Sequence, residues 1–128
     1  MNGRFTETAR GVILVWDKQT DLVWQKDYAT NMNWEQAIAY AVLLNMQHSG
    51  GYDDWRLPTI EELTTLISYK RSHPASDFPG MPFDWFWSSS SYAYYASLAW
   101  YVNGCYGYVG NGDKTSGGAA RCVRGERR

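Results

Sequence analysis

The sequence predicts an α+β domain in which two helices pack on a small twisted antiparallel sheet with long loops. Two observations support this fold class. Two segments with apolar residues at helical spacing each begin with a capping box, and the short apolar runs around them are separated by polar turns. The chain has 128 residues, which suits one domain with a proper core. We therefore expect residues 1–128 to form a single domain.

The N-terminal part predicts a β-hairpin. Residues 12–16 and 22–24 are short apolar runs joined by the polar segment 17–21. Runs of this length with a polar turn between them are typical of two paired strands.

A first helix should follow the hairpin. Asn33 and Gln36 have the spacing of a capping box, and the helix should end near residues 45–48, before the glycines at 50 and 51. Apolar residues recur at helical spacing and predict one stripe on the core, made of Trp34, Ala37, Ile38, Ala41 and Val42.

The second helix is indicated more sharply. Thr59 and Glu62 form a capping box, and Pro58 favours an extended lead-in. The helix should run to about Tyr69, with a buried stripe made of Ile60, Leu63, Leu66 and Ile67. Residues 70–84 hold three of the four prolines and no apolar periodicity, which predicts a long surface loop.

Four strands should complete the domain, at residues 85–89, 98–103, 106–109 and 120–124. The order of hairpin, helices, long loop and antiparallel strands is that of an α+β protein.

Composition and charge argue against several functions. The net charge is −1, and basic residues cluster only in a tail that we interpret as a solubilising end, made of Arg121, Arg124, Arg127 and Arg128. We therefore expect no nucleic-acid partner. No apolar run approaches the roughly 18 residues that a membrane span needs, so direct membrane insertion is not expected. The N-terminal segment lacks a hydrophobic signal core, and the compartment stays open, with display on a cell surface or a virion among the alternatives.

Cysteine and histidine usage predicts neither a disulfide framework nor a metal site. The chain has two cysteines and two histidines, without CxxC or HxxxH spacing. We expect no metal and no cofactor, and among oligomeric states we favour a monomer.

Residues 88–119 have the composition of a recognition surface. They hold six of the ten tyrosines, mixed with Ser, Gly, Ala and Asn, while only Asp113 and Lys114 carry charge. Tyrosine offers large amphipathic contact area at low entropic cost, and Ser, Gly and Asn adapt around it. Exposed strands and glycine turns share this composition, so composition alone leaves both interpretations open.

Several motifs occur in one order that resembles a known bacterial family. The N-terminal motifs are Asp17-x-x-Thr20-x-Leu22-x-Trp24, Trp34-x-x-Ala37 and Trp55-Arg56-Leu57-Pro58-Thr59-x-x-Glu62-Leu63. The C-terminal motifs are Phe86-Trp87-Ser88-Ser89-Ser90, Ala99-Trp100-Tyr101-Val102 and Arg121-Cys122-Val123-Arg124. From about Arg10 to Gly125 the chain is similar to the C-terminal domain family of the Legionella collagen-like adhesin. The resemblance implies a C-type lectin-like fold.

The motif residues also have a structural interpretation. The rings of Trp55, Trp87 and Trp100 flank regular elements and are expected in the core. Arg56 should bond to loop carbonyls, and Arg121 and Arg124 should lie on the polar face of a strand. The scaffold set is Trp55, Arg56, Trp87, Trp100, Arg121 and Cys122.

The chain departs from the family pattern at two places. The family commonly has Gly where Asp21 stands, so this turn should differ. It often has a Cys in the first helix that could pair with the one matching Cys122, whereas this chain has Tyr40-Ala41-Val42 there. Cys122 is then most simply a small buried apolar residue, although a bond between Cys105 and Cys122 remains an alternative.

Members of the C-type lectin-like fold that resemble this chain serve as variable proteins of diversity-generating retroelements. Adenine-directed mutagenesis of AAY codons in those systems never yields Trp, Met, Lys, Gln or Glu. Residues 1–87 contain 21 residues of these five types, whereas residues 88–119 contain two, Trp100 and Lys114. The depletion favours a variable protein that binds a protein or surface ligand.

The variable interpretation predicts that fixed residues alternate with ligand-facing ones. The fixed set is Trp87, Ala99, Trp100, Val102, Val109, Arg121 and Val123. The ligand-facing set is Ser91, Tyr94, Tyr95, Ser97, Asn103, Cys105, Tyr106, Tyr108, Gly110, Asn111, Asp113, Ser116, Gly117 and Gly118.

Two other functions were weighed. A fixed adhesin domain for carbohydrate or glycosaminoglycan fits the family, although the near-neutral charge argues mildly against a polyanion. The fold also includes formylglycine-generating enzymes, but the reactive cysteine pair that they need has no match here. His48 and His73 lie in polar, loop-like surroundings, so we expect no enzyme activity.

Overall fold

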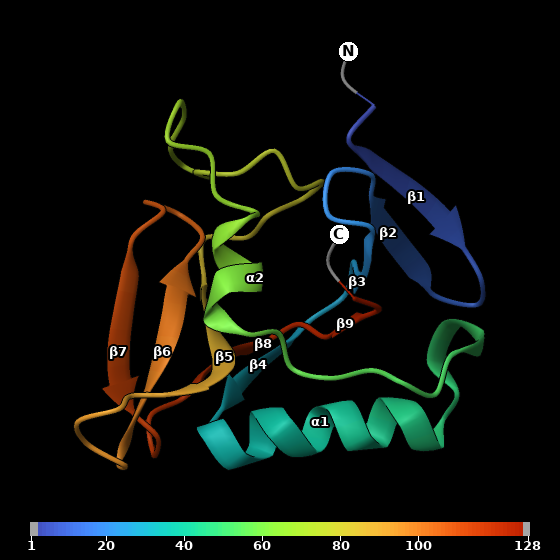
Figure 1. Cartoon of the computed structure of the whole chain (residues 1–128). Helices are drawn as coiled ribbons and strands as arrows, with labels where there is room; N and C mark the ends of the chain where they lie inside the picture. The colour runs from blue at the N-terminus through green and yellow to red at the C-terminus, as the bar shows by residue number, and fades with distance from the viewer. Residues whose placement is uncertain (1–2, 127–128) are drawn as a thin grey trace.

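The computed structural model describes residues 3–126 and arranges them around two sheets. Figure 1 shows the sheets on opposite sides of the molecule, with helix α2 (Ile60–Thr64) between them and helix α1 (Trp34–Met46) along the lower edge. The α+β class predicted from the sequence is confirmed.

The first sheet brings together both ends of the described chain. Its strands are β1 (Phe5–Ala9), β2 (Ile13–Asp17), β3 (Leu22–Gln25) and β9 (Val123–Arg124), in the order β1-β2-β3-β9. The predicted hairpin is confirmed as β2 and β3, with Val15 opposite Trp24. The sequence does not predict β1, because Phe5 is its only large apolar residue. Pairing with β2 along its whole length holds it as a strand.

The second sheet carries most of residues 88–119. Its strands are β4 (Ala29–Met32), β8 (Gly118–Ala120), β5 (Trp85–Ser91), β6 (Leu98–Asn103) and β7 (Val109–Asp113), in the order β4-β8-β5-β6-β7. The strand predicted at 106–109 is wrong, because residues 104–108 form the turn between β6 and β7. The single strand predicted at 120–124 is also wrong. There the chain leaves β8 in one sheet and enters β9 in the other.

Both capping boxes are confirmed. Asn33 caps α1 together with Gln36, and Thr59 caps α2 together with Glu62. However, α2 ends at Thr64 and does not reach Tyr69. The amides of Leu66 and Ile67 bond to carbonyls three residues back, which tightens the last turn, and Ile67 then forms a bridge with Ser76 in the loop.

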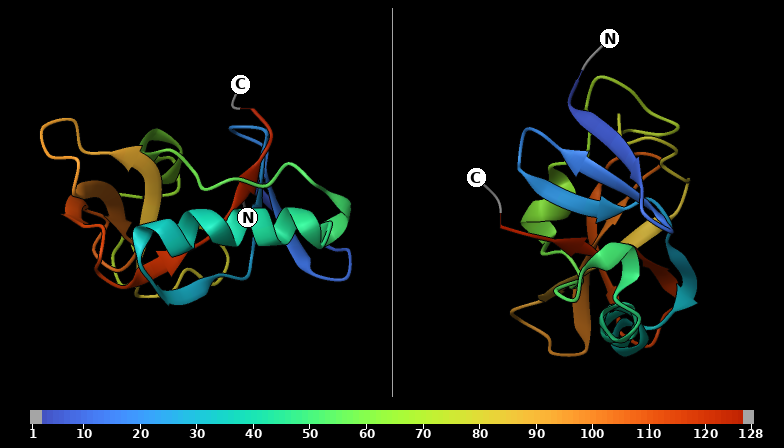
Figure 2. Two further views of the ribbon diagram at one scale, coloured as in Figure 1. Left: turned by 90° about the horizontal axis from the view of Figure 1, so that it is seen from below. Right: turned by 90° about the vertical axis from the view of Figure 1, so that its right-hand side faces the viewer.

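The core face of α1 differs from the predicted stripe. The buried residues are Ala37, Ala41 and Leu44, whereas Ile38 and Val42 are exposed. Figure 2 (left) shows α1 in front of the other elements when the molecule is seen from below, with one long side toward the viewer. The helix therefore carries apolar side chains both inward and outward, which a stripe assigned from spacing alone does not reveal.

Arg121 lies in the core, and the prediction that it belongs to a polar face or a solubilising tail is wrong. Its side chain is fully buried among Tyr28, Phe78 and Phe86, with its guanidinium carbon 4.4 Å from the Phe78 ring centroid. Nη2 donates to the carbonyl of Lys26 at 2.6 Å. Burial lowers the pKa of this guanidinium to about 10.

The other arginines of the predicted solubilising tail have different outcomes. Arg124 forms a two-bond ion pair with Asp54, 2.8 Å for each bond, so its charge is already neutralised. Arg127 and Arg128 lie outside the described residues. Among residues 3–126, no helix has the length and apolarity to span a membrane.

Candidate functional site

The exposed part of the second sheet forms a surface that we call the tyrosine-rich surface. It consists of the β6–β7 hairpin, the loop 92–97 before it and the loop 114–117 after it. Ten of the sequence-predicted ligand-facing residues are exposed there: Ser91, Tyr94, Tyr95, Ser97, Tyr106, Tyr108, Asn111, Asp113, Ser116 and Gly117.

Tyr101 lies in the middle of the β6–β7 hairpin, on the opposite face of β6 from its neighbour Trp100. In the β6–β7 register Tyr101 is opposite Gly110, and its ring lies so close that a Cβ added to Gly110 would be 2.7 Å from the Tyr101 hydroxyl. The ring is also 4.7 Å from Trp85 and 6.3 Å from Tyr108, centroid to centroid. Burial, and then the neighbouring Tyr108, raises the pKa of the Tyr101 hydroxyl. Glycine on β7 therefore lets an aromatic ring lie flat across the strand.

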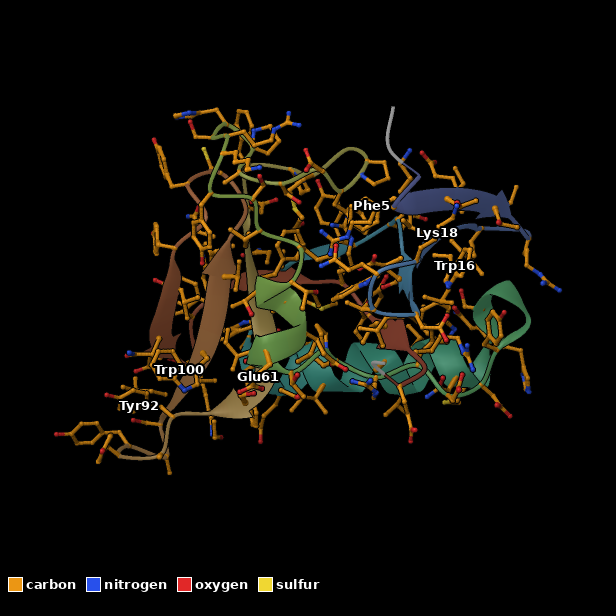
Figure 3. The ribbon with its side chains drawn as sticks, turned by 45° about the horizontal axis from the view of Figure 1, so that its top comes forward. Phe5, Trp16, Lys18, Glu61, Tyr92 and Trp100 are labelled. Atoms are coloured by element: carbon orange, nitrogen blue, oxygen red, sulfur yellow. The ribbon has the colours of Figure 1, made fainter. Side chains whose placement is uncertain are left out.

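A second aromatic group lies at the start of the hairpin. The ring of Tyr92 is 5.0 Å from Trp100, and Figure 3 shows these two side chains together at one end of the sheet. Tyr95 stacks parallel to Tyr92 at 6.3 Å, and Tyr94 lies 5.7 Å from it. Tyr94 projects furthest, with 82% of its surface exposed. Trp100 and Tyr92 are half-buried and support the two exposed rings.

Lys114 connects the loop 114–117 to the end of β5, to α1 and to the loop 92–97. Its ammonium lies 2.7 Å from the Ser91 hydroxyl and 4.1 Å from the Trp34 ring centroid, and its amide donates to the Ser97 carbonyl. The Asp113 carboxylate accepts bonds from the backbone and side chain of Thr115, which lower its pKa. These local bonds hold the loops in place, so a ligand meets a preorganised surface.

The β6–β7 turn lies at the other end of the hairpin. The Asn103 side-chain oxygen accepts from the amides of Cys105 and Tyr106, each at 2.9 Å, which is an Asx-type turn. The Tyr106 ring packs edge-on against His73 at 4.8 Å, and His73 in turn contacts Phe83. Tyr106 and Tyr94 therefore lie at opposite ends of the hairpin.

Four ligand-facing assignments do not fit their positions. Cys105 is 8% exposed and Gly118 is buried under Trp85, where an added Cβ would lie 2.6 Å from the ring. The predicted exposure is wrong for both. Asn103 and Gly110 are half-buried and shape the turn and the seat of Tyr101.

The residues predicted to form the scaffold also differ in burial. Trp55, Trp87, Arg121 and Cys122 are buried, whereas Arg56 and Trp100 are half-buried. Arg56 binds the Glu62 carboxylate with two bonds and donates to the Gly125 carbonyl. Val109, assigned to the fixed set, is 40% exposed, because β7 is an edge strand of its sheet.

Sequence reasoning missed several residues of this surface. Tyr92 and Tyr101 lie within residues 88–119 but are not among the predicted ligand-facing residues. For Tyr101, the glycines on the strand that pairs with its own are a sequence signal that indicates an exposed ring. His73 and the exposed Phe83 come from the long loop, and only the tertiary structure brings them to Tyr106. In residues 3–126 there is no group of three or more His, Cys, Asp or Glu side chains that could hold a metal ion.

The fold and this surface define the class: a small α+β domain whose exposed face has the character of a ligand-binding, adhesin-like module. The model of the Lcl C-terminal domain family matches residues 13–124. The chain therefore belongs to that family, and the resemblance stated from the motifs is confirmed. No curated protein matches the chain.

Proposed function

We propose that this protein is a non-enzymatic binding protein whose tyrosine-rich surface is diversified by a retroelement to recognise protein or cell-surface ligands. The observation that carries the proposal is where the two residues unreachable from AAY codons lie. Trp100 supports Tyr92, and Lys114 joins Ser91 to Trp34. Both are half-buried supports, while ten of the AAY-reachable types around them are exposed.

This arrangement suits a surface that must change while its fold persists. The buried residues between the exposed ones, Trp87, Ala99 and Val102, provide the packing that holds the sheet. Exposed side chains contribute little to stability, so they can be replaced at small energetic cost. Tyrosines on a rigid sheet lose little entropy on binding.

The deciding experiment is to sequence the DNA that flanks the gene. We expect a near-identical repeat of the codons for residues 88–124 that differs only at adenines, next to a reverse-transcriptase gene. A flanking region with neither feature would refute the retroelement part of the proposal.

A display library tests the structural part independently. Ten AAY codons at the exposed positions should give mostly folded, displayed protein, as judged by protease resistance. The matched library randomises buried positions of the same sheet, such as Trp87, Ala99 and Val102, and should be mostly unfolded. Equal folded fractions in the two libraries would contradict the assignment of a variable surface on a fixed scaffold.

Membership of the Lcl C-terminal domain family favours a second candidate, a fixed carbohydrate or glycosaminoglycan adhesin. Of the basic residues near the C-terminus, Arg121 is buried and Arg124 is paired with Asp54, so neither offers a free cation for salt-sensitive binding of a polyanion. A sugar would then stack on aromatic rings such as Tyr92 and Trp100. A glycan array with wild-type protein and the Tyr92→Ala variant tests this candidate, because specific glycan binding that the variant loses favours the fixed adhesin.

A further inference from the structure

Arg121 is a buried positive charge whose hydrogen bonds are incomplete. Only 1% of its surface is exposed, and with a pKa of about 10 it stays charged at neutral pH. A guanidinium carries N–H donors on every nitrogen. Nη2 donates to the Lys26 carbonyl, whereas Nη1 contacts only the Met81 sulfur, a weak acceptor 3.9 Å away. Nε has no hydrogen-bond partner among residues 3–126.

No negative charge is paired with this guanidinium. None of the ion pairs among residues 3–126 includes Arg121, and Asp27, which attracts it from a distance, is exposed. The rings of Tyr28, Phe78 and Phe86 offset part of the cost of burial through cation–π contacts. A charge inside a protein is nevertheless costly unless it is paired and hydrogen-bonded. The surroundings of Arg121 therefore favour a bound anion.

A small cavity adjoins Arg121 where α2 packs on β5 and β6 (Figure 1). Its volume is about 10 Å³, close to the room that one water-sized particle occupies. A polyatomic anion such as sulfate, or a carboxylate from a partner protein, is too large for this space. Apart from Arg121, the side chains that line the cavity are Leu63, Leu66, Ile67, Met81, Phe86 and Val102.

The cavity suits a monatomic anion better than a water molecule. A buried water makes about three hydrogen bonds and must donate as well as accept. The side chains of the wall are apolar apart from Arg121, and the backbone of Gly104, which also lines the cavity, already bonds to Ala75 and Asp84. A halide ion needs only donors, which Nε and Nη1 of Arg121 provide, and it also neutralises the buried charge.

We propose that the cavity beside Arg121 is a binding site for one chloride ion, held by charge-assisted hydrogen bonds from the guanidinium. The ion lies between α2, the second sheet and the crossover from β8 to β9 that contains Arg121. It therefore stabilises the packing of α2 and the connection between the two sheets. The site is formed mainly by buried side chains, and it does not depend on the function proposed for the tyrosine-rich surface.

Thermal unfolding in sodium salts of matched ionic strength tests the site. A ligand that binds only the folded state raises the melting temperature. We expect a saturable rise of about 3–5 °C when chloride replaces gluconate up to about 0.1 M, the shift produced by a ligand at about ten times its dissociation constant. Bromide should act like chloride. Sulfate should stabilise only through exclusion from the protein surface, without saturation.

Two variants should lose the saturable response. Arg121→Met removes the charge and its donors, and Val102→Ile keeps Arg121 but adds a methyl group to a residue that lines the cavity. Val15→Ile is the matched control, because Val15 is a buried valine of the same core cluster that does not line the cavity. Circular dichroism checks that each variant is folded. A response that persists in Val102→Ile, or that Val15→Ile loses equally, overturns the proposal.

Crystals grown in sodium bromide locate the ion directly, because bromide scatters anomalously and water does not. We expect an anomalous peak in the cavity, within hydrogen-bonding reach of the Arg121 guanidinium. The peak should be absent from crystals of Val102→Ile and present in those of Val15→Ile. Bromide found only on the surface of the wild-type protein would show that the cavity is not a halide site.

Discussion

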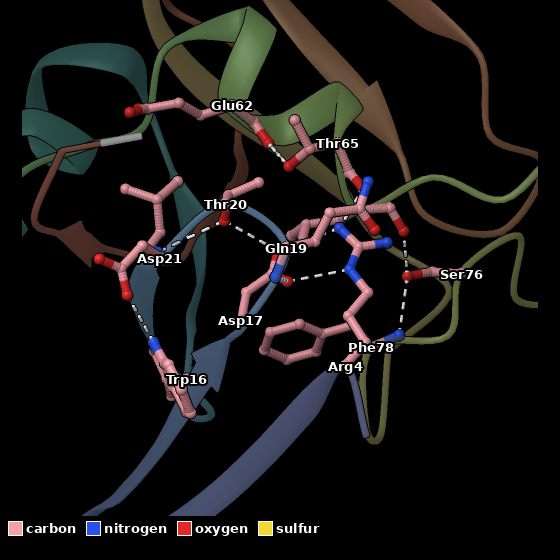
Figure 4. A network of polar contacts seen from close by, with 12 residues as sticks. Arg4, Trp16, Asp17, Gln19, Thr20, Asp21, Glu62, Thr65, Ser76 and Phe78 are labelled. Carbon is pink, nitrogen blue, oxygen red and sulfur yellow. Dashed lines mark hydrogen bonds and ion pairs between the residues drawn. The ribbon is translucent and has the colours of Figure 1, made fainter. Parts of the chain in front are cut away.

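Arg4 and Asp17 form a two-bond ion pair that ties the entry of β1 to the end of β2. Arg4 Nε and Nη2 lie 3.0 Å from Asp17 Oδ1 and Oδ2, and Nη2 also donates to the Thr65 carbonyl at 2.7 Å (Figure 4). The Asp17 carboxylate is fully buried and accepts further bonds from Thr20 and Gln19. One buried charge thus joins the first sheet to the turn after α2.

This ion pair should make stability fall in acid. Burial raises the pKa of Asp17, but the bonds from Arg4 and Thr20 outweigh it, and the net pKa lies below its ordinary value. A carboxyl whose pKa is lower in the folded protein stabilises it above the unfolded-state pKa, about 4, and this contribution is lost as the pH falls through the folded pKa. Thermal unfolding at decreasing pH below about 4 should therefore show that Asp17→Asn loses less stability than wild type.

At neutral pH, Asp17→Asn should cost about 1–3 kcal/mol in urea unfolding, because the substitution weakens bonds to a buried charge. The exposed pair of Glu7 and Lys26, 2.9 Å apart, supplies the control. Glu7→Gln should change stability by less than about 1 kcal/mol. Equal losses of stability in the two variants would show that burial of Asp17 does not strengthen its contribution to the free energy of unfolding.

Asp21 has a backbone φ of +67°, in the left-handed region that favours glycine. Its carboxylate offsets part of this strain by accepting a 3.0 Å bond from the Trp16 indole. Asp21→Gly removes both the strain and the bond, so its free energy of unfolding should stay near that of wild type. Asp21→Ala keeps the strain without the bond and should be less stable than Asp21→Gly by about 1 kcal/mol. Equal stability of the two variants would contradict this account of the turn.

The exposed tyrosines should contribute little to stability. Alanine at Tyr94, Tyr95, Tyr106 or Tyr108 should leave the melting temperature nearly unchanged, because these side chains are at least half exposed. Tyr101→Ala should cost about 1–3 kcal/mol, since its ring packs on Trp85 and covers Gly110. A drop of about ten degrees in any of the first four variants would place that ring in the core and exclude it from the ligand-facing set.

Ala41 and Cys122 pack in one buried cluster with Leu14, Leu44 and Trp55. Ala41→Cys should therefore restore the disulfide that the family resemblance implies, and raise stability by about 2–4 kcal/mol under oxidising conditions. Reduction should abolish the gain. Burial raises the pKa of the Cys122 thiol to about 12, so wild-type Cys122 should react with thiol reagents only after unfolding. Persistence of all three free thiols in folded, oxidised Ala41→Cys, where a disulfide would leave only that of Cys105, would show that the two positions do not meet.

The local signals in the sequence were reliable where a short-range bond decides the structure. Asn33 and Thr59 start the helices because each cap satisfies amides within three residues. The end of α2 was misplaced because a bridge to Ser76 ends it. Strand β1 was missed because its structure comes from pairing with β2.

The candidate site shows the same division. Composition indicated the tyrosine-rich stretch, but Cys105 and Gly118 could not be assigned to the interior without knowing that the turn and the Trp85 ring cover them. His73 and Phe83 join Tyr106 only through the path of the long loop.

The sequence by itself determined the α+β class, the two capped helices, the family and the stretch that carries the exposed tyrosines, because these follow from short-range spacing and composition. Only the tertiary structure decided which side of α1 is buried and where Arg121 lies. Both depend on contacts between segments that are far apart in the sequence. Ala37 and Ile38 have similar local signals, but only Ala37 faces the sheet.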